Sequence, residues 1–218
     1  MKVFDLSHLI CNNMPVYPGT EQPEIINATT IEKEGYAEKK ITMLSHVGTH
    51  IDAPAHILEG YETLDKINIC KFFGSACKID AIDSKNGKIG LELVKSHKSS
   101  IEKSDFILLN TGWSEYWNNE KYFEGYPTLT ADAAEWLCSF PIKGIGMDTI
   151  SADCCNSKNL PIHKILMSHK KIIIENLTSL LPVPKEDFFF SCLPLKISDS
   201  DGSPVRAAAI LLNNKDII

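Results

Sequence analysis

The chain has 218 residues, of which 44% are hydrophobic and 23% are charged, and this ordinary globular composition excludes a disordered or fibrous protein. Its 28 acidic residues outnumber its 22 basic residues, so the formal charge of −6 does not favour a nucleic acid as a partner. Because this length suits a single α/β domain, we expect one domain over residues 1–218.

The sequence carries no signal for a membrane or for secretion. No apolar run approaches the ~18 residues of a membrane span, and Asp5 stands where a signal peptide needs an apolar centre. The seven cysteines show no C-x-x-C spacing and no framework typical of a secreted domain. We therefore expect a cytoplasmic protein with reduced thiols and no membrane contact.

In chain order, the first predicted elements are strands. Residues 3–7 alternate like a strand and lead into a loop rich in turn formers at 12–19. Residues 40–50 contain many β-branched side chains and end before Pro54, which favours a strand over a helix. Apolar runs at 106–109 and 143–148 predict two buried strands.

Helices are predicted between the later strands. Thr130 is a good N-cap for a helix over 131–139, and Pro161 can begin a short helix that ends before a strand at 172–175. A further strand-like stretch covers 205–212. Strands that alternate with helices predict an α/β or mixed α+β domain with a sizeable sheet. Trp113, Tyr116 and Trp117 form an aromatic group that we expect to pack in a loop or an interface rather than to contact substrate.

Residues 46–56 hold the chemically informative side chains, because three of the seven histidines and one aspartate occur there. If this segment is a strand, then His46, Gly48, His50 and Asp52 share one face, and Gly48 leaves room between the two imidazoles. Two imidazoles and a carboxylate suit Zn, Mn or Fe(II), and the lack of a nearby cysteine argues against a structural thiolate site. The pattern therefore predicts an open, hydrolytic metal site.

The other histidines have plainer interpretations. A single histidine is usually a hydrogen-bonded core or surface residue, and we expect this for His8, His97 and His169. Taken alone, His163 reads as an exposed helical histidine and Glu175 as an exposed acid at a strand end.

The segment from His46 to His56 resembles the H-x-G-T-H-x-D-x-P-x-H signature of the metal-dependent cyclase family, which includes bacterial kynurenine formamidase (arylformamidase) and isatin hydrolase. The resemblance extends over most of the chain. Its other parts are Asp5-Leu6-Ser7, Pro15-Val16-Tyr17-Pro18-Gly19, Asn110-Thr111-Gly112-Trp113, Gly146-Met147-Asp148-Thr149-Ile150-Ser151, Ile174-Glu175-Asn176-Leu177, Leu193-Pro194-Leu195-Lys196 and Pro204-Val205-Arg206.

The resemblance implies a site with one or two metal ions per chain. His46 and His50 would hold one ion, Asp52 would bridge to a second, His163 would hold the second, and Glu175 would bridge both. His56 matches the family's general acid/base. Zn²⁺ is usual in the formamidases and Mn²⁺ in the isatin hydrolases.

The family also implies a compact α/β swivelling domain of β/β/α type with a mixed sheet, assembled as a homodimer or homotetramer with the active site near a subunit interface. Its formamidases act in tryptophan catabolism. Tyr17 stands where kynurenine formamidases carry Trp, and it can stack on an aromatic small-molecule substrate although it is smaller and adds a hydroxyl.

Our hypothesis is the hydrolysis of a carbon–nitrogen amide bond, such as that of N-formylkynurenine, by metal-activated water with His56 as general acid/base. An isatin-like cyclic amide or a lactone is the alternative substrate within the family. A different class of enzyme would use Cys154, Cys155 or Cys192 as a nucleophile, but Asp153 beside the first two disfavours the thiolate. A third interpretation is a metal-binding or small-molecule-binding protein without catalysis, which no residue of the site favours.

Overall fold

The computed structural model describes residues 1–84 and 87–212 and is built on a mixed sheet of nine strands. The strands lie in the order β1-β13-β11-β5-β7-β9-β10-β4-β12. Their bounds are β1 Lys2–Asp5, β4 His50–Asp52, β5 Phe73–Asp80, β7 Phe106–Asn110, β9 Gly144–Met147, β10 Ile172–Glu175, β11 Phe188–Ser191, β12 Gly202–Pro204 and β13 Ala208–Leu211.

The centre of the sheet consists of four parallel strands, β5, β7, β9 and β10. Strands of this kind are covered on both faces and need apolar side chains on both. In β7, Phe106 and Leu108 pack on one face of the sheet, whereas Ile107 and Leu109 pack on the other, and all four are buried. The short apolar runs of the sequence therefore become central strands.

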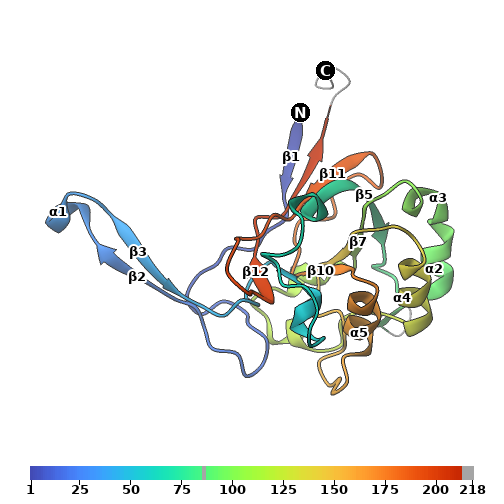
Figure 1. The fold of residues 1–218 in the computed structure, drawn as a ribbon, viewed down its shortest axis with the longest axis horizontal. Helices are drawn as coiled ribbons and strands as arrows, with labels where there is room; N and C mark the ends of the chain where they lie inside the picture. Colours follow the sequence, from blue (N-terminus) through green and yellow to red (C-terminus); the bar gives the residue numbers. More distant parts are fainter. Residues whose placement is uncertain (85–86, 213–218) are drawn as a thin grey trace.

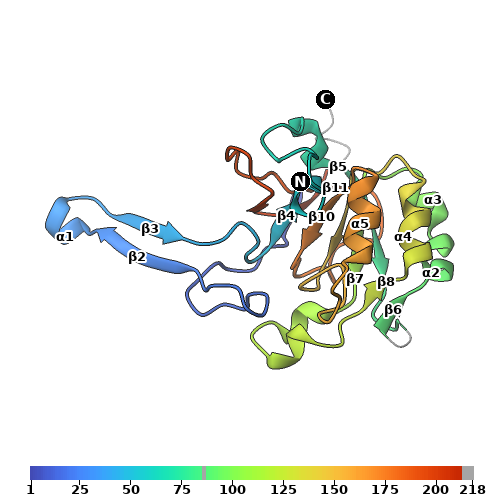
Figure 2. The same cartoon turned by 60° about the horizontal axis from the view of Figure 1, so that its bottom comes forward.

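Helices cover one face of the sheet (Figures 1 and 2). They are α2 Leu91–Ser96, α3 Lys98–Ile101, α4 Ala131–Cys138 and α5 Pro161–Ser168. Leu137 of α4 and Leu166 of α5 belong to the same core as Ile107 and Leu109, so the apolar stripes of the helices explain their position. A small parallel pair, β6 (Lys88–Ile89) and β8 (Thr128–Leu129), lies beside them.

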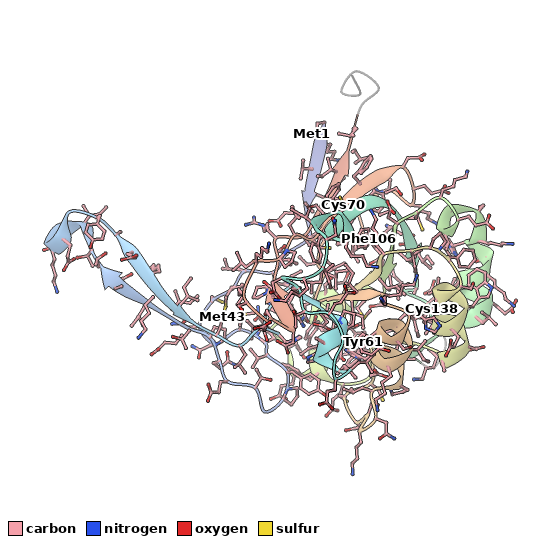
Figure 3. The ribbon with its side chains drawn as sticks, viewed as in Figure 1. Met1, Met43, Tyr61, Cys70, Phe106 and Cys138 are labelled. Carbon is pink, nitrogen blue, oxygen red and sulfur yellow. The ribbon has the colours of Figure 1, made fainter. Side chains whose placement is uncertain are left out.

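The other face of the sheet curls around a second core. Phe106, Phe188 and Phe190 pack there with Leu6 from the segment after β1. Ser7 forms a bridge with Leu177 just beyond β10, which draws the chain start across towards the centre of the sheet. Figure 3 shows Phe106 inside this densely packed body.

A long hairpin extends from this body (Figures 1 and 2). It consists of β2 (Glu24–Thr29), β3 (Glu38–Thr42) and the one-turn helix α1 (Ile31–Glu34) at its tip. Every residue from 31 to 42 is exposed, and in Figure 3 the outer part of the hairpin around α1 stands away from the body. Near its base, Ile25 of β2 bonds to the side chain of Asn12. We call residues 24–42 the arm.

The strands predicted at 106–109, 143–148 and 172–175 and the helices that follow Thr130 and begin at Pro161 are confirmed. The continuous strand predicted over 40–50 is wrong, because β3 ends at Thr42 and β4 begins only at His50. The seven cysteines are all free, as expected. Among the described residues, no helix combines the length and apolar character required to cross a membrane.

Candidate metal centre

Two of the predicted ligands lie on β4, in the interior of the molecule. His50 and Asp52 are 3% and 1% exposed and are separated by Ile51, whose side chain is buried in the opposite core. The period of two residues in a strand puts His50 and Asp52 on one face. β4 lies between β10 and β12, so both side chains are held by pairing on both edges of the strand.

The side chain of His46 also lies beside Asp52, but His46 does not belong to the same strand, although the sequence predicts that it does. It precedes β4 in a bend, and Gly48 has a φ of +63°, so that residues 46–52 are not one extended strand. A Cβ on Gly48 would meet Met14 and Ile10 at 3.2 and 3.3 Å rather than fill space between imidazoles. The prediction that Gly48 makes room for the metal is therefore wrong.

The room for His46 is provided by Gly202 in β12. A Cβ on Gly202 would lie closer to Cε1 and Nε2 of the His46 ring than non-bonded atoms approach. Because β12 pairs with β4 with Gly202 opposite Asp52, the glycine stands beside the imidazole. This packing lets the His46 Nδ1 come within 2.7 Å of the Asp52 Oδ1, which is also 3.2 Å from the His50 Nε2.

Glu175 and His163 complete a second group of donors around Asp52. Glu175 ends β10 directly opposite His50, and its Oε2 is 3.5 Å from the His50 Nε2. The His163 Nε2, on α5, is 3.2 Å from the Glu175 Oε1 and 3.7 Å from the Asp52 Oδ2. Both residues are 4% exposed, so their interpretation as exposed surface residues is wrong.

The two oxygens of Asp52 therefore face different partners. Oδ1 faces His46 and His50, whereas Oδ2 faces His163. The Glu175 carboxylate likewise faces His50 with one oxygen and His163 with the other. This arrangement is suited to two carboxylates that bridge a pair of cations.

Three histidines, His46, His50 and His163, face Asp52 with one ring nitrogen. In each of them the other ring nitrogen, which points outward from the site, lies within hydrogen-bond distance of an oxygen acceptor. His50 Nδ1 donates to the Gly48 carbonyl at 2.9 Å, and His163 Nδ1 lies 2.7 Å from Asp153 Oδ2. His46 Nε2 lies 2.9 Å from Asp201 Oδ2. With the proton on the outward nitrogen, the inward nitrogen of each ring offers a lone pair, which is the usual arrangement of metal-binding histidines.

Asp153 and Asp201 are functional residues that the sequence reasoning misses. Asp153 also accepts hydrogen bonds from the backbone N–H groups of Ile162 and His163, and so joins the first turn of α5 to the site. No local pattern relates Asp201 to His46, because 155 residues separate them and only the pairing of β12 with β4 brings them together.

The electrostatics of the site favour a bound cation. Burial lowers the pKa of His46, but the carboxylates of Asp52 and Asp201 outweigh it and raise the pKa to about 9. Burial likewise opposes charge on Asp52, yet the neighbouring histidines hold its pKa well below the usual value. Protons on the histidines thus compensate for buried carboxylates in the absence of another positive charge.

One atom tests directly whether the residues fit a metal ion. Asp52 Oδ2 is buried and has no hydrogen-bond partner in the part of the chain that the structure describes. A buried carboxylate oxygen without a partner is costly, and a cation between it and His163 Nε2 would remove this cost. Imidazole nitrogens and carboxylate oxygens are the donors that Zn²⁺ and Mn²⁺ take, so the residues fit such an ion.

His56 lies beside this centre, in a 3₁₀ turn over Pro54–His56. Its ring packs on that of His46 with 3.8 Å between centroids, and its Nδ1 is 3.3 Å from Asp201 Oδ2. Burial lowers the pKa of His56, so the neutral ring predominates at neutral pH. An Asp201 that accepts from Nδ1–H leaves Nε2 as the nitrogen that can take a proton.

The centre opens into a cavity of about 490 Å³. Tyr17 lies in its wall together with Leu44, Ile150 and Leu160, and so faces the same space as His50 and His56. The Tyr17 hydroxyl donates to the Cys155 carbonyl at 3.2 Å, which satisfies the added polar group. The volume suits a small molecule with an apolar part.

The remaining histidines and the aromatic group lie elsewhere. His97 and His169 bond to the carbonyls of Leu93 and Ile165, as expected. His8 instead stacks on Trp117 with 3.8 Å between ring centroids, and its Nε2 is buried without a hydrogen bond to any described residue. Trp113, Tyr116 and Trp117 pack around buried Tyr122, as their packing interpretation predicts.

Comparison with known proteins connects this geometry to a family. Residues 4–154 match the Cyclase family model, described as "Putative cyclase". The chain is 35% identical over 206 residues to a kynurenine formamidase of Bacillus cereus, with 93% of this chain and 94% of the relative covered.

Two solved structures share the fold. One, a "potential metal-dependent hydrolase with cyclase activity", has a TM-score of 0.78 at 30% identity and covers 97% of this chain and 98% of its own. The other, an isatin hydrolase bound to the product analogue thioisatinate, has a TM-score of 0.88 at 23% identity and covers 97% and 93%. The curled mixed sheet is thus the fold of these proteins.

Proposed function

The chain belongs to the cyclase family and is a hydrolase of that family, and we propose that it cleaves the carbon–nitrogen bond of an aryl formamide such as N-formylkynurenine. The observation that carries this proposal is the buried donor set around Asp52 at the base of a cavity of small-molecule size, with one carboxylate oxygen that has no hydrogen-bond partner among the described residues. The full-length similarity to a kynurenine formamidase supports the choice of substrate.

The side chains divide into two groups of ligands. His46, His50 and Asp52 would hold one divalent ion, and Asp52, His163 and Glu175 would hold a second, with Zn²⁺ the first choice and Mn²⁺ the alternative. Such ions, when bound, activate water at neutral pH and polarise the formyl oxygen.

The remaining steps belong to side chains of the chain itself. Neutral His56 accepts a proton at Nε2 from the attacking water and returns it to the leaving nitrogen, while Asp201 holds its Nδ1–H. Tyr17 and its apolar neighbours in the cavity wall contact the aryl group of the substrate. The products are formate and an aryl amine.

A direct assay tests the proposal. Purified protein reconstituted with Zn²⁺ should hydrolyse N-formylkynurenine at a kcat/KM of about 10⁴ M⁻¹s⁻¹ or more, and chelator treatment should abolish the activity. If the protein hydrolysed a cyclic amide in a chelator-sensitive way but did not hydrolyse the formamide, its substrate would be an isatin-like cyclic amide instead. Activity that resists the chelator but is lost on thiol alkylation would contradict the metal mechanism.

Substitutions separate ligands from the acid/base. His50→Ala and His163→Ala should lose both bound metal and turnover, whereas His56→Ala should keep the metal and lose about 10²- to 10⁴-fold in kcat. Metal is measured by elemental analysis of the desalted protein. His97→Ala is the matched control, since its ring bonds to the Leu93 carbonyl and to Ser96 and does not line the cavity of the metal centre. Full metal content in His50→Ala would refute the ligand assignment.

We also propose that the protein is a homo-oligomer, a homodimer or a homotetramer. The arm supports this, because two strands without a core are at best marginally stable in water. Apolar side chains of a second copy would cover those that the arm exposes.

A further inference from the structure

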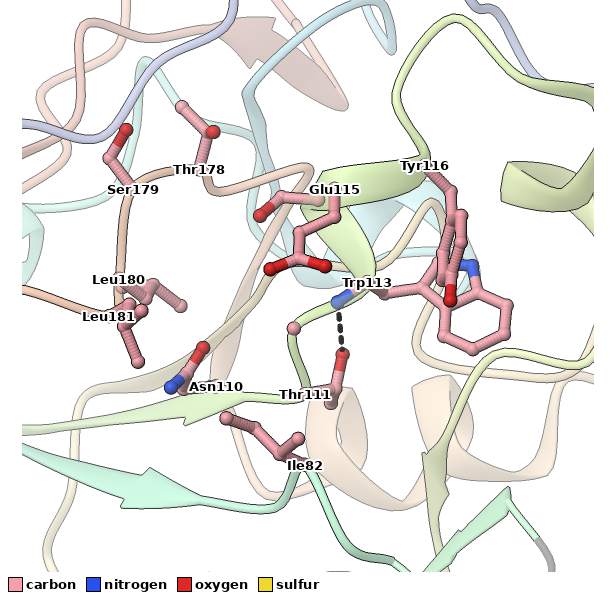
Figure 4. A pocket seen from close by; sticks show the side chains of 12 residues that line it. Ile82, Asn110, Thr111, Trp113, Glu115, Tyr116, Thr178, Ser179, Leu180 and Leu181 are labelled. Atoms are coloured by element: carbon pink, nitrogen blue, oxygen red, sulfur yellow. Dashed lines mark hydrogen bonds between the residues drawn. The ribbon is translucent and has the colours of Figure 1, made fainter.

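A second cavity of about 450 Å³ lies at the carboxyl ends of β5 and β7. It shares no lining residue with the cavity of the metal centre. The ends of parallel strands are a common place for ligand sites in open α/β sheets, because loops with polar side chains converge there. Figure 4 shows this cavity from close by.

Asn110 is the last residue of β7, and a hydrogen bond on the side away from the cavity fixes the orientation of its side-chain amide. Its Nδ2 donates to Asp80 Oδ1 at 2.8 Å, and Asp80 is held in turn by Lys78 at 3.2 Å and Lys185 at 3.6 Å. Because an ionised carboxylate only accepts hydrogen bonds, the NH₂ group of Asn110 must face Asp80.

The carbonyl oxygen of Asn110 is consequently turned away from Asp80. In Figure 4 this oxygen lies on the side of Glu115. Asn110 is 2% exposed, and its Oδ1 accepts no hydrogen bond from the residues that the structure describes. An acceptor that is held in this orientation at the cavity wall can take a hydrogen bond from a ligand in the cavity.

Glu115 faces the same space from the opposite side. Figure 4 shows its carboxylate directed towards the middle of the cavity. It forms no ion pair within residues 1–84 and 87–212, and no lysine, arginine or histidine is among the residues that line the cavity. Two neighbouring donors are already engaged, since the Thr111 hydroxyl bonds to Asp148 and the Trp113 indole N–H bonds to the Tyr122 carbonyl.

The rest of the wall is mixed, because apolar side chains lie beside the hydroxyl groups of Ser114, Thr178 and Ser179. Ile82, Leu180 and Leu181 line one side, and Trp113 and Tyr116 line another. Apolar side chains beside these two acceptors, of which the exposed Glu115 carboxylate is charged, match a ligand with a cationic donor on an apolar body. We propose that this cavity binds a primary ammonium compound with an aryl or alkyl body, the ammonium between Asn110 Oδ1 and the Glu115 carboxylate.

Binding of 2-phenylethylamine to the full-length protein, followed by ligand-observed NMR, tests the site. The neutral isostere 2-phenylethanol has the same body without the charge. We expect saturable binding of the amine, a dissociation constant about fivefold or more higher for the alcohol, and a similar loss of amine affinity in Glu115→Gln. Glu124→Gln is the matched control, because Glu124 is exposed and lies outside the cavity wall.

The metal centre serves as an internal check. The amine should bind equally well to metal-loaded and chelator-treated protein, since the two cavities are separate. Equal affinity for amine and alcohol, unchanged binding in Glu115→Gln, or no saturation by about 10 mM would overturn the proposal. Loss of binding after chelation would assign the amine to the metal centre instead, which also overturns it.

Discussion

Asp201 connects the metal centre to the residue proposed to move the proton. Its Oδ2 lies 2.9 Å from His46 Nε2 and 3.3 Å from His56 Nδ1, while its Oδ1 accepts from the Ser45 hydroxyl. One carboxylate thus orients a ligand and an acid/base together. Carboxylates behind metal-binding histidines raise the basicity of the ring and fix its orientation.

Removal of this carboxylate should weaken metal binding and catalysis together. We expect Asp201→Ala to reduce the metal affinity about 10- to 100-fold and also to lower kcat when metal is saturating, because His56 loses its orientation. A competition titration with a chromophoric chelator gives the affinity. Asp199→Ala is the control, since Asp199 is exposed and its carboxylate bonds to Lys66 and Ser198 at the surface. An unchanged affinity in Asp201→Ala would show that Asp201 has no part in holding His46.

Asp148 gives the molecule a pH-dependent contribution to stability. It is fully buried, and burial raises its pKa to about 6 although Thr111 donates to it from both its backbone N–H and its hydroxyl. The carboxyl is therefore harder to ionise in the folded chain than in the unfolded chain. The stabilisation is complete below the unfolded pKa near 3.8 and is lost as the pH rises through about 6.

The comparison of Asp148→Asn with the native chain isolates this effect. Because the amide does not titrate, the stability of the variant relative to the native chain should rise by about 2 kcal/mol between pH 4 and pH 7, since the carboxyl pKa lies near 3.8 in the unfolded chain and at about 6 in the folded chain. Urea unfolding at several pH values, with chelator present throughout, measures the difference. A difference that stays constant with pH would mean that Asp148 titrates alike in both states.

At the scale of elements, the short strand β12 determines the shape of the site. It pairs with β4, brings Asp201 to His46, and leaves space for the His46 ring at Gly202. An added methyl group at Gly202 would displace an imidazole that contacts Asp52 and Asp201 at once.

Gly202→Ala should consequently reduce metal affinity by about tenfold or more with little change of overall fold, since His46 must move out of register with Asp52. Circular dichroism and the same chelator competition test this. Gly90→Ala is a suitable control, because a Cβ at Gly90 would meet no atom of the described residues within 4 Å. Native metal affinity in Gly202→Ala would mean that the ring can shift without cost.

Local sequence patterns predicted those elements whose environment is uniform along their length. β7 and β10 are buried on both faces and read as apolar runs, and Pro161 marks the start of α5 because its fixed φ suits the first helical turn. The period of two residues failed between His46 and His50, because Gly48 adopts a positive φ and breaks the alternation. Pairing over long sequence separations, such as β12 with β4, left no local signal.

The sequence predicted which residues are the candidate ligands, but it did not predict how they are positioned or which side chains hold them. The spacing of His46, His50 and Asp52 and the resemblance to the cyclase family indicated all the residues that the structure brings around Asp52. The carboxylates of Asp153 and Asp201, which hold the outward nitrogens of His163 and His46, required the fold.

The arm exposes several large apolar side chains to solvent although it lies outside the packed body of the molecule. The arm carries Ile26 and Ile41 on its two strands and Ile31 and Tyr36 at its tip, each more than 40% exposed. The cost of ordering such a hairpin in water is not recovered by its own contacts. A second copy of the chain that packs on the arm would supply the missing burial.

The arm should therefore control the oligomeric state. We expect the native chain to be a dimer or tetramer by light scattering coupled to size exclusion, and Ile31→Glu combined with Tyr36→Glu to shift it towards the monomer, because charges at a buried contact oppose association. Ile69→Glu is the control, since Ile69 is 63% exposed on the body of the molecule. A native monomer would refute the proposed assembly, and an oligomer that tolerates both arm charges would place the interface on another surface. Because the arm leaves the body next to Leu44 and Tyr17 of the metal-site cavity, dissociation that also raises the KM for N-formylkynurenine would locate the interface beside the substrate.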